Sequence, residues 1–131
     1  MQRRRIEAFL TLATEEITVA ERLRVDHPRQ SIYFAQQAAE KLIRALLEVE
    51  LVSVGKTHDL DALAMLLSAS NPFRDRFRAL STLSAASTRY RYPTVAGRLW
   101  DVADQELNEA IVAVTGLKAE VETWIAARFS A

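Results

Sequence analysis

The stretch FAQQAAEKLIRALL, residues 34–47, decides the fold of this chain. Its apolar residues recur at intervals of three and four, as on a helix that faces a core, and they cover a broad arc. The core-facing positions are Ala35, Ala38, Ala39, Leu42, Leu46 and Val49, widened by Ile43, Ala45 and Leu47. Pro28 suits a first helical turn. We therefore predict a helix from about residue 28 to 51 and expect it to be the most buried of the set.

The same periodicity predicts four more helices. One runs from Arg4 to about Arg24. A short helix carries Leu60, Leu63, Leu66 and Leu67 and is capped by Thr57 or Asp59. The next helix is opened by Asn71-Pro72 and has Phe73, Phe77, Leu80 and Ser84 on one side. A long last helix, for which Asp101 is a possible cap, carries Leu107, Ile111, Val114, Leu117, Val121, Trp124 and Ile125. Gly55 is expected to end the second helix. With 50% apolar residues and only three Gly and three Pro, the chain is predicted to be all-α, a single domain over 1–131 folded as an antiparallel bundle.

Several classes of site are excluded by what the sequence lacks. It has no cysteine, so disulfides and thiolate metal sites cannot form. Its two histidines, His27 and His58, have no zincin spacing, and no Gly-rich phosphate loop is present. We expect no metal and no cofactor. The apolar residues after Arg3-Arg4-Arg5 are too interrupted for a signal peptide or membrane span, which favours a cytoplasmic protein without membrane contact.

The charges are unevenly distributed although they sum to zero. Residues 73–98 hold six Arg and one Asp, whereas residues 99–127 hold six acids and one Lys. Either the two segments pack together and pair their charges, or the arginines form an anion-binding patch.

A narrow polar ribbon follows the second helix. Its members are Gln37, Glu40, Lys41, Arg44 and Glu48, at spacings of three and four. The ribbon is interpreted either as a solvated face with weak ion pairs or as part of a site. His58, at the start of the short helix, has two interpretations. It is either a capping or packing residue, or it is a catalytic one.

The stretch TRYRYP, residues 88–93, is predicted to begin a loop that runs to about Leu99. In a structural interpretation, its Tyr rings cover the end of the bundle and its arginines pair with acids of the last helix. In a functional one, the guanidiniums of Arg89 and Arg91 bind phosphate and a Tyr face stacks on a base.

Three pieces of the sequence together resemble a HEPN domain (higher eukaryotes and prokaryotes nucleotide-binding). They are residues 34–47, the run Thr57-His58-Asp59-Leu60, and Arg91-Tyr92-Pro93 ahead of the last helix. The resemblance covers nearly the whole chain. It implies an antiparallel up-and-down four-helix bundle with an additional short helix, usually a homodimer. Such proteins are often encoded beside a minimal nucleotidyltransferase in toxin-antitoxin pairs.

The resemblance also implies which residues form a site. Carried onto this sequence, the candidate ligand-binding residues are Gln37, Glu40, Lys41, Arg44, His58, Arg91 and Tyr92, with Arg89 and Tyr90 as neighbours. Many relatives are metal-independent ribonucleases with an Arg, four to six residues, then a His near the start of the last helix. Here no histidine follows Arg89 or Arg91, and the one match to that spacing, residues 22–27, lies at the end of the first helix. Arg44 stands where relatives commonly carry Lys.

The leading prediction is therefore a non-catalytic or weakly active dimer that binds a nucleotide or RNA phosphate and works with a nucleotidyltransferase-type partner. The alternatives are a ribonuclease toxin with a nonstandard active site, in which His58 is the general base and Arg91 holds the scissile phosphate, and a purely structural dimerisation partner.

Overall fold

The protein is all-helical in the computed structural model, which describes residues 2–129 apart from the side chains at 86 and 87. The helices are α1 (Gln2–Leu23), α2 (Pro28–Val49), α3 (Leu60–Met65), α4 (Arg74–Arg78), α5 (Thr82–Arg89) and α6 (Asp104–Phe129). Over the described residues there is no strand. The predicted all-α class is confirmed.

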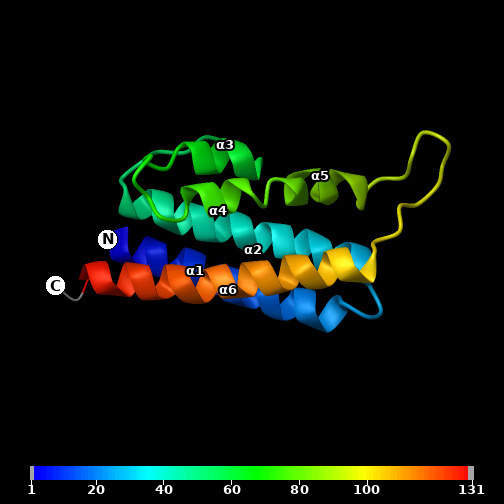
Figure 1. The fold of residues 1–131 in the computed structure, drawn as a ribbon, viewed down its shortest axis with the longest axis horizontal. Coiled ribbons are helices and arrows are strands. Elements are labelled where there is room, and N and C mark those ends of the chain that lie inside the picture. Colours follow the sequence, from blue (N-terminus) through cyan, green and yellow to red (C-terminus); the bar gives the residue numbers. More distant parts are fainter. Residues whose placement is uncertain (1, 130–131) are drawn as a thin grey trace.

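The helices form an antiparallel bundle of four columns (Figure 1). α1, α2 and α6 are three of the columns, and α4 continued by α5 is the fourth, in which α5 packs against α2 (Figure 1). The short helix α3 packs against α4 and α2. α1 begins and α6 ends at the same end of the bundle (Figure 1). This is the up-and-down arrangement with one extra short helix that the family resemblance implies.

Helix α2 is the most enclosed element because it contacts α1, α3, α5 and α6. Its alanines at 35, 38, 39 and 45 are buried, and small side chains let neighbouring helices approach closely. Leu42, Ile43 and Leu46 are fully buried between them. Three polar residues of α2 are also buried, Ser31, Gln36 and Glu40, and they must find partners inside the fold.

Two helix ends differ from the prediction. α2 ends at Val49, and Leu51 rather than Gly55 adopts the left-handed conformation that terminates it, with φ 61°. Val52 N–H donates to Leu47 O at 3.0 Å and Leu51 N–H to Glu48 O at 3.2 Å, the two bonds of a Schellman motif. The expected cap Asp101 also lies too early, because α6 begins at Asp104.

The helix expected from Asn71-Pro72 onward is divided in two. Bonds from each N–H to the carbonyl three residues back, such as Leu80 to Phe77 and Ser81 to Arg78, replace helical bonds between α4 and α5. The Asn71 side chain accepts from Phe73 N–H at 2.9 Å, so this residue caps a turn before α4. α5 then extends to Arg89, so the first two residues of TRYRYP are helical.

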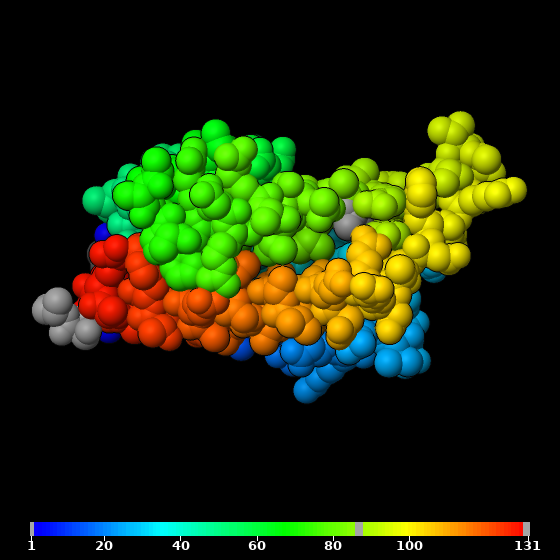
Figure 2. Space-filling view, in the orientation of Figure 1, coloured from blue at the N-terminus to red at the C-terminus, as the bar shows by residue number. Residues whose placement is uncertain are grey.

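The segment between α5 and α6 projects from one end of the bundle (Figures 1 and 2). A tight turn closes it, in which Thr94 N–H donates to Arg98 O and Gly97 N–H to Thr94 O, both at 2.8 Å. Gly97 has φ +81°, a conformation that favours glycine. Val95 and Leu99 are exposed on this segment.

Replacing Gly116 with Ala is expected to stabilise the fold. Gly116 lies inside α6, where a Cβ would meet no atom within 4 Å, and Ala is favoured over Gly in helices by about 1 kcal/mol. Gly97→Ala is the matched control and should destabilise by about 1 kcal/mol because of its positive φ. Urea unfolding followed by circular dichroism measures both. A loss of stability in Gly116→Ala would mean that another surface packs closely on α6.

Candidate functional site

Glu40 of α2 organises the first group of predicted site residues. This residue is only 3% exposed, so the solvated-face interpretation of the ribbon is wrong at this position. Arg44 Nε lies 3.0 Å from Glu40 Oε2, and His58 Nδ1 lies 3.0 Å from Glu40 Oε1. Arg44 Nη2 also donates to Thr57 O at 2.8 Å. One buried carboxylate thus holds an arginine of its own helix and a histidine of the following loop.

Local chain geometry fixes His58 at the start of α3. Asp59, one of the two caps predicted from the sequence, is the N-cap of this helix and accepts from Asp61 N–H at 3.0 Å. Gln36 Nε2 donates to His58 O at 3.3 Å, which ties the backbone of the loop to α2. The His58 side chain is itself 72% exposed. Its ring therefore faces solvent while its Nδ1 edge is held by the protein.

A chain of polar contacts links this group to α1. Gln37 Nε2 donates to Gln36 Oε1 at 2.8 Å, and Lys41 Nζ donates to Gln37 Oε1 at 3.5 Å. Lys41 Nζ also lies 3.1 Å from Glu16 Oε1. Burial raises the pKa of Glu16 above its usual value, and the Lys41 charge opposes that rise. Gln37 and Lys41 thus have polar partners within the fold.

Arg91 and Tyr92 belong to a second group at the other end of α2. The Arg91 guanidinium carbon lies 4.8 Å from the centre of the Tyr33 ring and 5.5 Å from that of Tyr92. A hollow of about 260 Å³ opens here, lined by Arg29, Gln30, Tyr33, Tyr90, Arg91 and Tyr92. Arg29 and Arg91 bring positive charge to the hollow, and no carboxylate lines it.

Arg89 is placed beside the hollow but does not line it. Its guanidinium lies 5.1 Å from the Tyr90 ring centre and 5.9 Å from that of Trp100. Both predicted arginines of TRYRYP thus stack on aromatic rings, whereas the structural interpretation expected them to pair with acids of the last helix. Among the described residues, one ion pair joins the arginine-rich segment 73–98 to the acidic segment 99–127. It is formed by Arg76 and Glu120.

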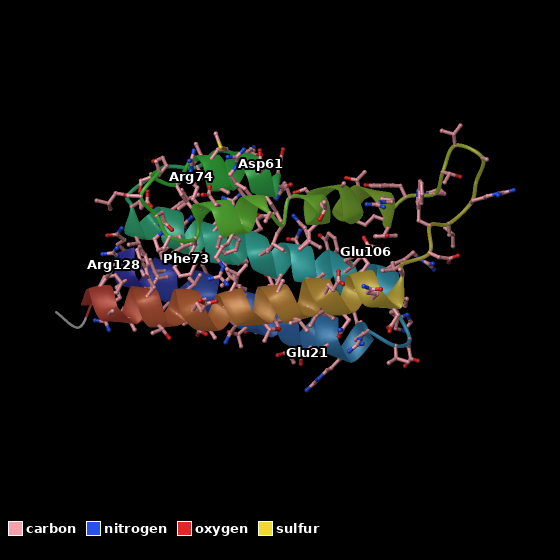
Figure 3. The ribbon with its side chains drawn as sticks, viewed as in Figure 1. Glu21, Asp61, Phe73, Arg74, Glu106 and Arg128 are labelled. Carbon is pink, nitrogen blue, oxygen red and sulfur yellow. The ribbon has the colours of Figure 1, made fainter. Side chains whose placement is uncertain are left out.

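Tyr90 provides the contact with α6 that the arginines do not make. Its hydroxyl donates to Glu106 Oε2 at 2.8 Å, and the ring is buried. Glu106 lies in the first turn of α6, at the end of the bundle where α5 enters the projecting segment (Figure 3). Burial raises the pKa of the Tyr90 phenol, the hydrogen bond to Glu106 and its charge raise it further, and Arg89 opposes the rise. This bond anchors the loop that carries Arg91.

The predicted site residues therefore form two groups rather than one. Glu40, Arg44 and His58 meet, with Gln37 and Lys41 beside them, whereas Arg91 and Tyr92 lie around the hollow. Over residues 2–129, no hydrogen bond or ion pair joins one group to the other. The sequence analysis missed Arg29, Tyr33 and Gln36. The signal was present for Tyr33, because positions 33, 37, 40 and 44 follow one face of a helix.

Two expected absences can be examined only in the described part of the chain. There, no three His, Asp or Glu side chains are grouped so that they could hold a metal ion. None of the described helices has the length and apolar character needed to cross a membrane.

The raised pKa of Tyr90 predicts that its phenol ionises above the ordinary tyrosine value of about 10. An ultraviolet titration of the folded protein should show this late phenol, and Tyr90→Phe should remove it while the control Tyr92→Phe should not. Tyr90 keeps its proton in the folded state at a pH where it ionises in the unfolded chain. Stability should consequently fall as the pH rises above the ordinary tyrosine value of about 10. A titration in which the late phenol survives in Tyr90→Phe would contradict this assignment.

Comparison with known proteins gives one match. A family model described as HEPN domain matches residues 6–124, which is most of the chain. No curated protein and no solved structure matches the chain. The matched region includes α2, the His58 group and the hollow around Arg91. The chain therefore belongs to the HEPN domain family.

Proposed function

We propose that this HEPN domain binds the phosphate of a nucleotide or of RNA in the hollow around Arg91. The observation that carries the proposal is the contact of the Arg91 guanidinium with the rings of both Tyr33 and Tyr92. Stacking on two rings restricts the side chain while its N–H edges stay available. A planar guanidinium held in this way can bind phosphate through two parallel hydrogen bonds.

The charge of the hollow supports an anionic ligand. Among the described residues, neither Arg29 nor Arg91 forms an ion pair with a carboxylate. Arg29 Nη1 is 3.4 Å from Trp100 O, a contact that leaves its positive charge uncompensated. Other arginines of the chain, such as Arg44 and Arg76, do have carboxylate partners. Arg29 and Arg91 therefore bring two positive charges without carboxylate partners to one hollow.

The shape of the hollow favours phosphate binding over enclosure of a whole nucleotide. Its volume of about 260 Å³ is below the range of about 300–1,000 Å³ that is usual for pockets that enclose small molecules. Tyr92 is 57% exposed, and a base or ribose can pack on it outside the hollow. We expect the phosphate to supply most of the affinity and the base to add little selectivity.

We further propose that the domain works as a homodimer with a nucleotidyltransferase-type partner in a toxin-antitoxin type system. Family membership supports this proposal. The segment between α5 and α6 adds support, because it exposes Tyr92, Val95, Leu99 and Trp100 beside the hollow. Exposed apolar groups gathered on a projecting loop suit contact with another protein.

Metal-independent RNA cleavage is a second candidate function, and His58 held by Glu40 is the observation that favours it. A general base needs to reach the group from which it takes a proton. His58 does not line the hollow that holds Arg91, and this separation makes phosphate binding the better-supported function. If neither binding nor cleavage occurs, a purely structural dimerisation role is the interpretation left.

Calorimetric titration with ATP, GTP and a short RNA tests the binding proposal. Arg91→Ala should weaken binding at least about tenfold, since a charge-assisted hydrogen bond contributes about 1.5–3 kcal/mol. Added salt should weaken wild-type binding as well. Arg4→Ala is the matched control, because Arg4 is exposed on α1 at the opposite end of the bundle. Equal loss in both variants, or no binding by the wild type, would contradict the proposal.

Incubation of the wild type with the same RNA in the presence of a chelator tests the second candidate. Cleavage that disappears in His58→Ala would establish the ribonuclease function. Intact RNA would contradict the ribonuclease function.

A further inference from the structure

His58 combines an exposed ring with a rigid attachment. The side chain is 72% exposed, yet its Nδ1 lies 3.0 Å from Oε1 of Glu40, a residue that is 3% exposed. An exposed histidine that served only to cap or pack would not need a buried carboxylate. Burial of that carboxylate is costly unless it is paired. A buried carboxylate thus orients a side chain that faces solvent.

The partners of Glu40 determine which ring nitrogen carries the proton. Arg44 Nε donates to Glu40 Oε2 at 3.0 Å, and the two residues form an ion pair. An ionised carboxylate can only accept hydrogen bonds, so Nδ1 of His58 must be the donor. In the neutral ring Nε2 then carries the lone pair. Among the described residues Nε2 has no hydrogen-bond partner, so this lone pair is available to an incoming group.

We propose that His58 is a nucleophilic histidine that accepts a phosphoryl group at Nε2. The donor is a compound whose phosphorus carries a good leaving group, as the terminal phosphate of a nucleoside triphosphate does. The Nε2–P bond forms as the P–O bond to the leaving group breaks, and the leaving group departs with the bonding electrons. Nδ1 keeps its proton and continues to donate a hydrogen bond to Glu40. The negative charge of Glu40 offsets the positive charge that develops on the ring.

Glu40 acts in this proposal as a positioning residue, and Arg44 and Gln36 support it. Arg44 spans Glu40 and the carbonyl of Thr57, while Gln36 holds the carbonyl of His58. The ring is therefore fixed from its side chain and from its backbone. Because none of these contacts involves the hollow around Arg91, the proposal is independent of phosphate binding there and can succeed or fail separately.

The chain contains its own control in His27. This residue is also exposed, but it precedes α2 and makes no side-chain capping bond. The two histidines are the only ones in the sequence. They differ in the feature that the proposal depends on, which is the carboxylate on Nδ1. Because both histidines are in the same molecule, they meet the same reagent concentration and the same solvent. A difference in their labelling rates therefore reports on their local surroundings.

The experiment treats the folded protein with phosphoramidate, a small phosphoryl donor that releases ammonia, and follows each histidine by mass spectrometry under conditions that preserve phosphohistidine. We expect His58 to be labelled about tenfold faster than His27, the lower end of the effect that carboxylate partners have on metal-bound histidines. The same reaction in concentrated urea should label both at equal rates, since unfolding removes Glu40. Equal rates in the folded protein would overturn the proposal.

Glu40→Gln tests the positioning role directly. The amide keeps the shape of the side chain but cannot carry the negative charge, so the rate at His58 should fall toward that of His27, while His27 itself stays unchanged. Circular dichroism establishes that the variant is folded. If it is not folded, the comparison of folded and urea-treated wild type still decides the proposal. An unchanged rate at His58 in a folded Glu40→Gln protein would overturn it.

Discussion

The enclosure of α2 is the constraint on which the rest of the structure depends. A helix that contacts α1, α3, α5 and α6 has little surface left for water, so its polar side chains need partners inside the protein. Glu40 meets this need by holding Arg44 and His58. The position of the loop before α3 thus follows from the requirement to satisfy one buried carboxylate. A fold with a more exposed second helix would place no such demand on residues 57–59.

The same helix carries its charges in two different states. Around Glu40 each cation faces an acid, because Arg44 pairs with Glu40 and Lys41 with Glu16. Near the start of α2, Arg29 lies with Arg91 in a hollow without a carboxylate. The zero net charge of the sequence hides this contrast. Buried charges are paired for stability, whereas the unpaired ones lie where solvent or a ligand can compensate them.

Much of the fold could be predicted because it depends on local patterns. The ends of α1, the start of α2 at Pro28 and the cap at Asp59 follow from periodicity and capping chemistry. The break between α4 and α5 could not be predicted, since it depends on how the chain packs back along α2. Of the site, the i,i+4 spacing pointed to Glu40 with Arg44. Tyr33 was missed because an aromatic residue at helical spacing is usually a core residue, and only the folded chain shows Arg91 lying on it.

The separation between the two groups also limits how they can act together. Tyr33 and Glu40 are seven residues apart on one helix, which corresponds to about 10 Å along its axis at 1.5 Å per residue. A rigid and buried helix keeps that distance fixed, so a phosphate seated against Arg91 is not delivered to His58 by motion of α2. Contact between the two groups requires a ligand long enough to span them or a change in the projecting segment that carries Arg91. The bond from Tyr90 to Glu106 opposes the second route, because it ties that segment to α6. Under the two proposals made above, the groups of a single chain would therefore act on different ligands, or on distant parts of one extended ligand.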